Sequence, residues 1–182
     1  MTERAELQAL IERVEKLTGP DRCVDAEIMF DLFAKPVGKK DDGGPMGYLW
    51  PEDNPSWSFG IRFPGKDREW FAQCRKRIEG ETLLVERDGA FVLMNSQRIP
   101  ELTKSLDAAT SVIERVRPEW AYGFDSGRKT HLAFVDPHDL ADRMFGARHT
   151  AEAANSSIAL ILALLRSLEA DLRAPAPSGG KR

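Results

Sequence analysis

Hydrophobic residues near the start of the chain recur every three or four positions, with charged residues between them. This spacing predicts an amphipathic helix over residues 3–17. Its apolar positions are Leu7, Leu10, Ile11, Val14 and Leu17. A second stripe of the same spacing predicts a helix over residues 21–34, which follows a corner at Gly19 and Pro20 and has Asp21 in its first turn. We expect the two helices to pack against a common sheet or against each other.

Alternating apolar and polar residues, the pattern of a half-buried strand, appear further along the chain. Residues 57–63 alternate in this way, and the β-prone runs 82–86 and 90–94 flank Arg87-Asp-Gly. Asp-Gly between two such runs predicts a tight hairpin. A second hairpin is predicted from the strands around Tyr122 and His131, which a turn at Asp125-Ser-Gly-Arg connects.

Two further helices are predicted in the second half of the chain. Ser105 is well placed to cap a helix over residues 105–116, which Pro118 ends. The last helix is predicted over residues 151–172, with Thr150 as its cap and a charged loop before it. Its apolar line is Ile158, Ile161, Leu162, Leu165, Leu168 and Leu172. Together these elements predict an α+β fold in which a mostly antiparallel sheet is packed between helices, as an α-β-α sandwich.

The middle of the chain departs from these regular patterns. Residues 36–80 are rich in proline, glycine and aromatic residues, which interrupt helices, although residues 67–79 resemble a short charged helix. Residues 174–182 are too poor in apolar side chains to pack. We therefore predict a single domain over residues 1–173 with an insertion at about 36–80, followed by a disordered tail.

Composition narrows the class of partner. The chain has 182 residues, a net charge of −3 and an isoelectric point near 5.7, so no overall basic field is present to attract nucleic acid. The first residues lack an apolar run, and no apolar window approaches the ~20 residues of a membrane span, so we expect a cytoplasmic protein without a membrane partner. Cys23 and Cys74 stand far apart, which favours two reduced, mostly buried thiols over a disulfide.

No pattern in the sequence predicts a catalytic, metal or cofactor site. His131, His138 and His149 lack the close spacing of zinc ligands, and the chain has no glycine-rich phosphate-binding loop. A nucleophilic grouping of Ser105, Asp107 and His131 lacks the strand-turn-helix elbow, and Ser105 already serves as a helix cap. We expect a protein that is not an enzyme and that uses no metal or cofactor.

Four short segments, taken in order, resemble the phage ABA sandwich domain family of small phage and prophage accessory proteins. The segments are Leu17-Thr-Gly-Pro-Asp-Arg-Cys-Val-Asp-Ala-Glu-Ile, Ser105-Leu-Asp-Ala-Ala, Trp120 and the apolar helix at 151–166. The chain departs from the family pattern at residues 36–80 and at Asn155-Ser-Ser. The resemblance implies a phage-encoded accessory protein that acts in the host-cell cytoplasm.

The sharpest candidate site combines aromatic and basic residues around the second hairpin. Strand alternation puts Trp120 and Tyr122 on one side of their strand, Arg128 and Lys129 lie at the hairpin tip, and Arg98 comes from the preceding strand end. A tip that carries two cations beside an exposed aromatic would stack a base and pair with a phosphate. The alternative is that these residues are core aromatics and separate surface charges.

We therefore predict an accessory protein that binds a small nucleotide-like ligand, and sequesters it in an anti-defence role, without catalysis. This activity rests on an analogy of size, setting and fold class with compact phage anti-defence proteins. The alternative is a protein-protein interaction or structural role that uses the aromatic insertion at 48–63 as a partner surface. A ligand binder predicts a concave pocket lined by arginine and aromatic residues, which a homo-oligomer would form between its subunits. A partner protein predicts a flat apolar patch.

Overall fold

The computed structural model describes residues 3–39, 41, 43–45, 47–49, 58–64, 82–87, 90–127, 129–137 and 148–173. The chain divides into two compact units. The terminal unit combines Met1–Pro20 with Leu102–Arg182, and the central unit is Asp21–Glu101. Because each unit has its own sheet, the two are described separately below.

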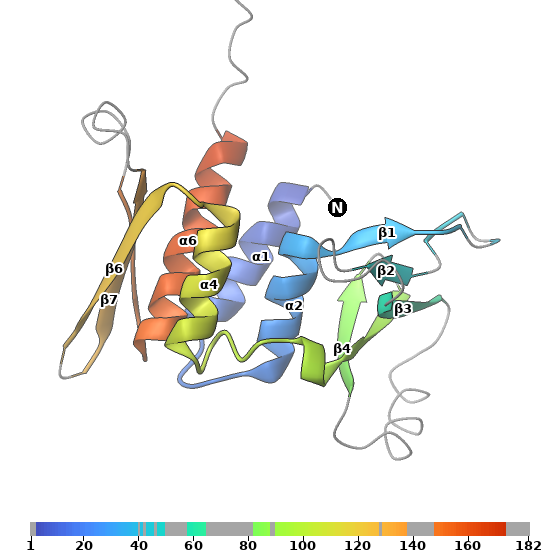
Figure 1. Cartoon of the computed structure of the whole chain (residues 1–182), viewed down its shortest axis with the longest axis horizontal. Helices are drawn as coiled ribbons and strands as arrows, with labels where there is room; N and C mark the ends of the chain where they lie inside the picture. Colours follow the sequence, from blue (N-terminus) through green and yellow to red (C-terminus); the bar gives the residue numbers. More distant parts are fainter. Residues whose placement is uncertain are drawn as a thin grey trace, which may run out of the picture. The chain divides into compact units, whose positions relative to one another are not determined.

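The described part of the terminal unit is a three-stranded antiparallel sheet with helices beside it (Figure 1). Its helices are α1 (Glu3–Glu15), α4 (Leu106–Val116) and α6 (Ser156–Arg173). Its strands are β6 (Trp120–Ser126), β7 (His131–Pro137) and β8 (His149–Ala153), in the order β6-β7-β8. Helix α6 packs against β7 and β8 and also contacts α1 and α4, so it forms the centre of this unit.

Helix α6 is buried around most of its circumference because it has neighbours on several sides. Ile158, Ile161 and Leu165 are fully buried, and so is the polar residue Ser167. The Ser167 hydroxyl donates a 2.7 Å hydrogen bond to the Leu164 carbonyl, so the buried polar group is satisfied within the helix. A helix that is apolar on all sides is typical of a core position.

The start of α6 differs from the prediction. Asn155 caps the helix, because its Oδ1 accepts a 2.8 Å hydrogen bond from the Ile158 backbone N–H. The Asn155 amide nitrogen also donates to the Thr103 carbonyl at 3.1 Å, which ties the cap to the chain before α4. The predicted cap Thr150 lies in β8 instead, so the prediction of helix from residue 151 was wrong over its first turn.

Residues 149–153 form a strand because their side chains alternate between two environments. Ala151 is buried, whereas Thr150 and Glu152 are exposed. The strand pairs antiparallel with β7, from His131 opposite Ala153 to Val135 opposite His149. A hydrogen-bonded ladder together with a buried face outweighs the local capping tendency of a threonine that an acidic residue follows.

The predictions for the helices α1 and α4 are confirmed. Leu10, Ile11 and Val14 of α1 are buried, as the apolar stripe requires, although the helix ends at Glu15. Ser105 caps α4 as predicted, since its Oγ accepts a 3.2 Å hydrogen bond from the Ala108 backbone N–H. The buried face of α4 carries Ala109, Val112 and Ile113.

The described part of the central unit is a five-stranded antiparallel sheet with one long helix. Its elements are α2 (Arg22–Phe33), β1 (Lys35–Val37), β2 (Gly47–Leu49), β3 (Ser58–Pro64), β4 (Thr82–Arg87), β5 (Ala90–Asn95) and the short 3-10 helix η1 (Ser96–Arg98). The strands follow the order β1-β2-β3-β5-β4, and α2 packs against β4. The pairing of β4 with β5 confirms the predicted hairpin, and β3 confirms the predicted strand at 57–63 to within one residue.

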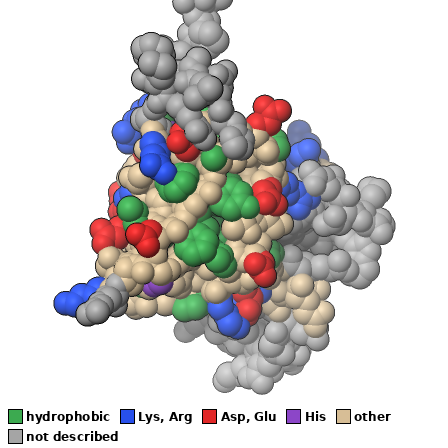
Figure 2. Space-filling model, turned by 60° about the vertical axis from the view of Figure 1, so that its left-hand side comes forward, with side chains coloured by type: hydrophobic (Ala, Val, Ile, Leu, Met, Phe, Trp, Pro, Cys, Tyr) green, Lys and Arg blue, Asp and Glu red, His purple; other side chains and the backbone are tan. Residues whose placement is uncertain are grey.

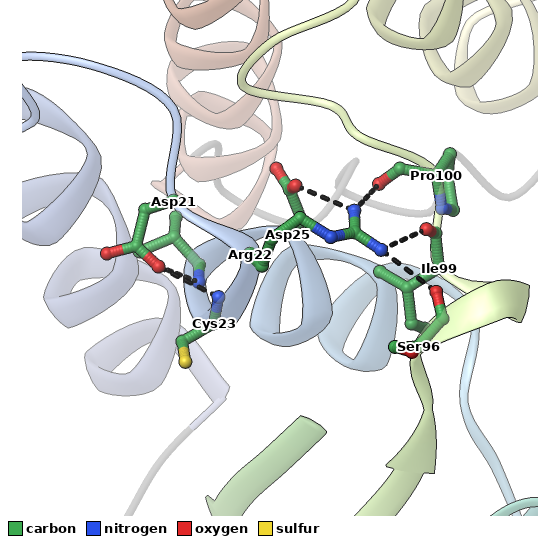
Figure 3. A network of polar contacts seen from close by, with 8 residues as sticks. Asp21, Arg22, Cys23, Asp25, Ser96, Ile99 and Pro100 are labelled. Carbon is green, nitrogen blue, oxygen red and sulfur yellow. Dashed lines mark hydrogen bonds and ion pairs between the residues drawn. The ribbon is translucent and has the colours of Figure 1, made fainter. Parts of the chain in front are cut away.

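A polar network fixes the start of α2 (Figure 3). Asp21 caps the helix one residue before its first turn, with Oδ1 accepting from the Cys23 and Val24 backbone N–H groups at 2.8 and 3.1 Å. The Arg22 guanidinium pairs with the fully buried carboxylate of Asp25 at 3.0 Å. It also donates to three carbonyl oxygens of the chain after β5, at 2.6 to 2.9 Å; they belong to Ser96, Ile99 and Pro100. The buried acid is therefore both neutralised and tied to a second segment.

The α+β class and the antiparallel pairing are confirmed, but the expectation of one common sheet was wrong. Strand β4 belongs to the five-stranded sheet and β7 to the three-stranded sheet. Each sheet joins strands that are near one another along the chain, such as β4 with β5 and β6 with β7, so local hairpins decide the partition. Helices α1 and α2 accordingly pack against different elements, α6 and β4. The prediction of a single domain stays a prediction.

Several predictions fall on residues outside the described ranges. These are the charged helix at 67–79, the turn at 88–89, His138, Arg128 and the tail at 174–182. Cys74 is also outside them, whereas Cys23 is exposed, which corrects its expected burial. Among the helices described, none is long and apolar enough to cross a membrane.

Candidate functional site

The predicted site residues occupy separate positions in the structure. Trp120 is the first residue of β6, and Tyr122 follows on the same side of the strand. Lys129 is exposed in the turn between β6 and β7. Arg98 is the last residue of η1 in the central unit, and Arg128 lies outside the described residues.

The hairpin register separates the aromatic residues from the tip. Trp120 lies opposite Pro137 at one end of the hairpin, and Ser126 lies opposite His131 at the other. Six residue steps along a strand span about 20 Å. The predicted alternation of Trp120 and Tyr122 is therefore observed, but Lys129 lies at the opposite end of the hairpin from Trp120.

Trp120 instead contacts Arg117 and His149, two residues that the sequence analysis did not place near it. The guanidinium carbon of Arg117 lies 4.5 Å from the centroid of the indole ring, in a cation-π contact. The His149 ring lies near-parallel to the indole, with centroids 6.0 Å apart and an interplanar angle of 14°. Arg117 also forms an ion pair with Asp171 of α6. Arg117, Trp120 and His149 are named the Trp120 cluster below.

The sequence contained a local signal that Arg117 lies near Trp120, but it contained no such signal for His149. The Trp120 backbone N–H donates to the Arg117 carbonyl at 3.0 Å. This bond closes a tight turn that contains Pro118 and directly follows the end of α4. The proximity of Arg117 to Trp120 therefore follows from a turn that the proline in the sequence indicates. His149 reaches the cluster only because β8 pairs with β7, and that strand was missed.

Electrostatics around the Trp120 cluster do not favour an anion. The Tyr122 hydroxyl donates a 2.6 Å hydrogen bond to Glu114 of α4, and this bond raises the pKa of Tyr122 above 10.0. Burial lowers the pKa of His149 below its ordinary 6.5, and Arg117 adds to this effect while Asp171 opposes it. The carboxylates of Glu114 and Asp171 therefore face one arginine and a mostly neutral imidazole at pH 7, and such a group repels a phosphate more than it attracts one.

His131 takes part in a hydroxyl network rather than in the predicted nucleophilic grouping. Its Nδ1 lies 2.9 Å from the Ser156 Oγ and 3.2 Å from the Ser126 Oγ. The two hydroxyl oxygens are 3.5 Å apart. Ser105 is engaged elsewhere as the cap of α4. The network links both strands of the hairpin to the first residue of α6, which gives it a structural use.

The second face of the β6-β7-β8 sheet, named the outer face here, carries large apolar side chains. Its members point away from the buried residues Ala133, Val135 and Ala151 by strand alternation. They are Ala121, Gly123, Asp125, Leu132, Phe134, Asp136, Thr150 and Glu152. Leu132 is 51 % exposed, one of the most exposed large apolar side chains described. Figure 2 turns β6 and β7 toward the viewer and shows hydrophobic side chains gathered together, with acidic and basic ones around them.

Phe134 is held in place at the middle of the outer face. A Cβ atom on Gly123, its partner across the ladder, would lie 2.7 Å from the Phe134 ring, so the ring lies directly over the glycine. The guanidinium carbon of Arg148 lies 3.7 Å from the ring centroid. The glycine makes room for the ring and the arginine covers part of it, so the aromatic side chain is ordered before any partner binds.

Metal chemistry finds no support in the described ranges. No group of three or more His, Cys, Asp or Glu side chains lies close enough together there to hold a metal ion. His138 and the acids that follow it lie outside those ranges. Of the residues considered as ligands, His131 contacts two serines and His149 contacts Trp120.

No family model, no curated protein and no solved structure matches the chain. The resemblance to the phage ABA sandwich domain therefore stays a prediction from four short segments of the sequence.

Proposed function

We propose that this protein acts by binding another protein chain, and that the outer face of the β6-β7-β8 sheet is the surface that it uses. The observation that carries the proposal is Leu132, a large apolar side chain that is half exposed beside an ordered Phe134 ring. A flat apolar centre with a charged rim has the composition of a protein interface. Partner binding was the alternative function predicted from the sequence, and the surface proposed for it is now the outer face in place of residues 48–63.

The surface predicted from the sequence was the aromatic insertion at 48–63, and the first aromatic residue of that segment has a contact within the central unit. Tyr48 of β2 is 9 % exposed and packs edge-on against Phe30 of α2, with ring centroids 4.6 Å apart. An aromatic side chain in that position stabilises the central unit. The exposed large apolar side chains of the described chain are Leu132, Phe124 and Leu172 of α6, and of these Leu132 lies on the outer face, whereas Phe124 lies on the face of Ala133.

A site-specific cross-link tests this proposal. A photoreactive phenylalanine analogue in place of Leu132 is expected to form covalent adducts with another chain in cells that express the protein. The same analogue in place of Ser111, an exposed residue of α4, is the matched control. Adducts at equal yield from both positions, or from neither, would contradict the use of this face.

A second candidate function, supported by the Trp120 cluster, is binding of a small nucleotide-like ligand. An indole with a guanidinium 4.5 Å away is a group that stacks planar ligands. The neighbouring carboxylates favour a neutral or cationic base over a phosphate. Calorimetric titration with nucleosides and the matching nucleotides is expected to give tighter binding for the nucleosides, and loss of both on Arg117→Leu. Equal binding by that variant would remove the cluster from consideration.

The phage setting and the sequestering role are part of the proposal through the sequence resemblance. A phage accessory protein that works by contact fits either surface. Mass spectrometry of the small molecules that heat releases from the purified protein separates the two candidate functions. A nucleotide-like compound that co-purifies with the protein supports ligand binding, and its absence favours binding of another protein.

A further inference from the structure

We propose that the chain which binds the outer face is a second copy of this protein, with the two outer faces packed against each other and their strands running in opposite directions. This inference rests on the proposed function and adds the identity of the partner. It is carried by the arrangement of charges along β8 and β6.

Charge is distributed unevenly along the outer face. Arg148 precedes β8 directly, and Glu152 lies four residues later on the same side of the strand. Four residue steps correspond to about 13 Å. Asp125 of β6 and Glu152 both flank Leu132, which is paired with each of them in the ladder. One end of the face therefore carries two acids, and the other end carries Arg148 together with the single acid Asp136.

Two symmetric ways of stacking the face on itself keep the strands of the two copies aligned, and charge selects between them. A twofold axis across the strands places each β8 over the other β8 in reverse, so that Glu152 faces Arg148 of the second copy. A twofold axis along the strands places β8 over β6, so that Glu152 faces Asp125. The first arrangement pairs opposite charges twice because a twofold interface repeats every contact, and the second brings like charges together.

The apolar centre of the face fits the same arrangement. With the axis across the strands, the Thr150 row lies on the axis, and Phe134, which is paired with Thr150, lies near its own copy. Two aromatic rings that meet in this way bury apolar area. Leu132 then lies between the Phe134 ring and the Asp136 row of the second copy, which cover its exposed part.

The size of the face sets the expected strength. Strands about 4.8 Å apart, two of seven residues and one of five, give an area of roughly 300 Å². Stable complexes bury about 800 Å² on each partner. The self-association is therefore expected to be weak, with a dissociation constant on the order of 100 µM, and should be measured up to millimolar protein.

A charge-reversal experiment tests the arrangement by sedimentation equilibrium of the full chain. Glu152→Arg and Arg148→Glu are each expected to weaken self-association by about tenfold, because each variant alone faces like charges. An equimolar mixture of the two variants is expected to associate again, since every contact across the axis then pairs opposite charges. Glu12→Arg and Arg4→Glu, which make the same charge changes at exposed positions of α1, are the matched controls.

Each outcome bears on the inference. Recovery in the mixture, with unaffected controls, supports the second copy. Self-association that persists in both variants places the dimer contact elsewhere and overturns it. A monomer at every concentration, with adducts from position 132 only to a different protein, overturns the second copy while the proposed function stands. A monomer without such adducts contradicts both. If a variant fails to fold, a cross-linked species of twice the chain mass from position 132 decides the question.

Discussion

The two faces of the middle strand β7 differ in the size of their apolar side chains, although β6 adds the aromatic residues Trp120, Tyr122 and Phe124 to the face of Ala133 and Val135. The face toward α6 carries Ala133, Val135 and Ala151, which are small and buried. The outer face carries Leu132 and Phe134, which are larger, and Leu132 is 51 % exposed. In a strand that only had to stabilise its own fold, the larger apolar residues would be expected on the buried face.

The terminal unit divides its hydrophobic area between the core beneath α6 and the outer face of the sheet. Small side chains on β7 and β8 let α6 approach the sheet closely, and the helix supplies the large residues of that layer, such as Ile161 and Leu165. The core is complete without Leu132 and Phe134. Their apolar surface is therefore left for a contact outside this core, which is the basis of the proposed interface.

The largest effect is expected from shortening a side chain of α6. Leu165→Ala should lower the free energy of unfolding by about 2–5 kcal/mol, because the side chain is fully buried and its loss leaves a cavity. Denaturant unfolding measures the change. Leu172→Ala on the same helix is the matched control, since Leu172 is 42 % exposed and should cost far less. Equal costs would mean that α6 is not the centre of this core.

The next effect comes from enlarging a small residue of the buried face. Ala133→Leu should destabilise the protein by about 1–3 kcal/mol, because α6 leaves no room for the added carbons. Ala121→Leu makes the same change on the outer face of β6 and should shift stability by less than about 0.5 kcal/mol. Thermal and denaturant unfolding of the two variants compare the faces directly. A tolerated Ala133→Leu would contradict close packing of α6.

The sequence predicted the elements whose signals are local. Ser105 capped its helix as expected because serine before a helical stripe needs only its own neighbours. The start of α6 was misplaced because Thr150 and Glu152 satisfy a capping pattern as well as Asn155 does. Only pairing with β7 decides between them, and that contact joins segments that residues 138–148 separate along the chain.

The candidate site was predictable to the same extent. Alternation along β6 correctly placed Trp120 and Tyr122 on one side. The distance from Trp120 to the hairpin tip required the register, and the contact with His149 required β8. The division into two sheets is likewise a choice among strand partners, and each strand's own composition leaves that choice open.

A smaller, pH-dependent effect is expected from His149 on the edge strand β8. Its pKa in the folded protein lies below the ordinary 6.5, chiefly because of burial. The unfolded chain takes up a proton near pH 6.5 and the folded protein does so only at lower pH. The stability contribution is therefore complete above pH 6.5 and is lost as the pH falls from there through the folded pKa. His149→Gln should flatten this part of a stability-pH curve measured by urea unfolding, and an unchanged slope would assign it to other groups.

The smallest effect on folding, and the sharpest contrast with Leu165, is expected for Leu132→Ala. Half of the Leu132 side chain is already in water, so at micromolar protein the free energy of unfolding should change by less than about 0.5 kcal/mol. At millimolar protein the unchanged chain should gain stability by self-association, through mass action, and the variant should not. Unfolding curves at both concentrations measure the two terms separately. A loss of about 2 kcal/mol at micromolar protein would mean that another part of the same chain covers the outer face, and the contrast between the two faces would then disappear.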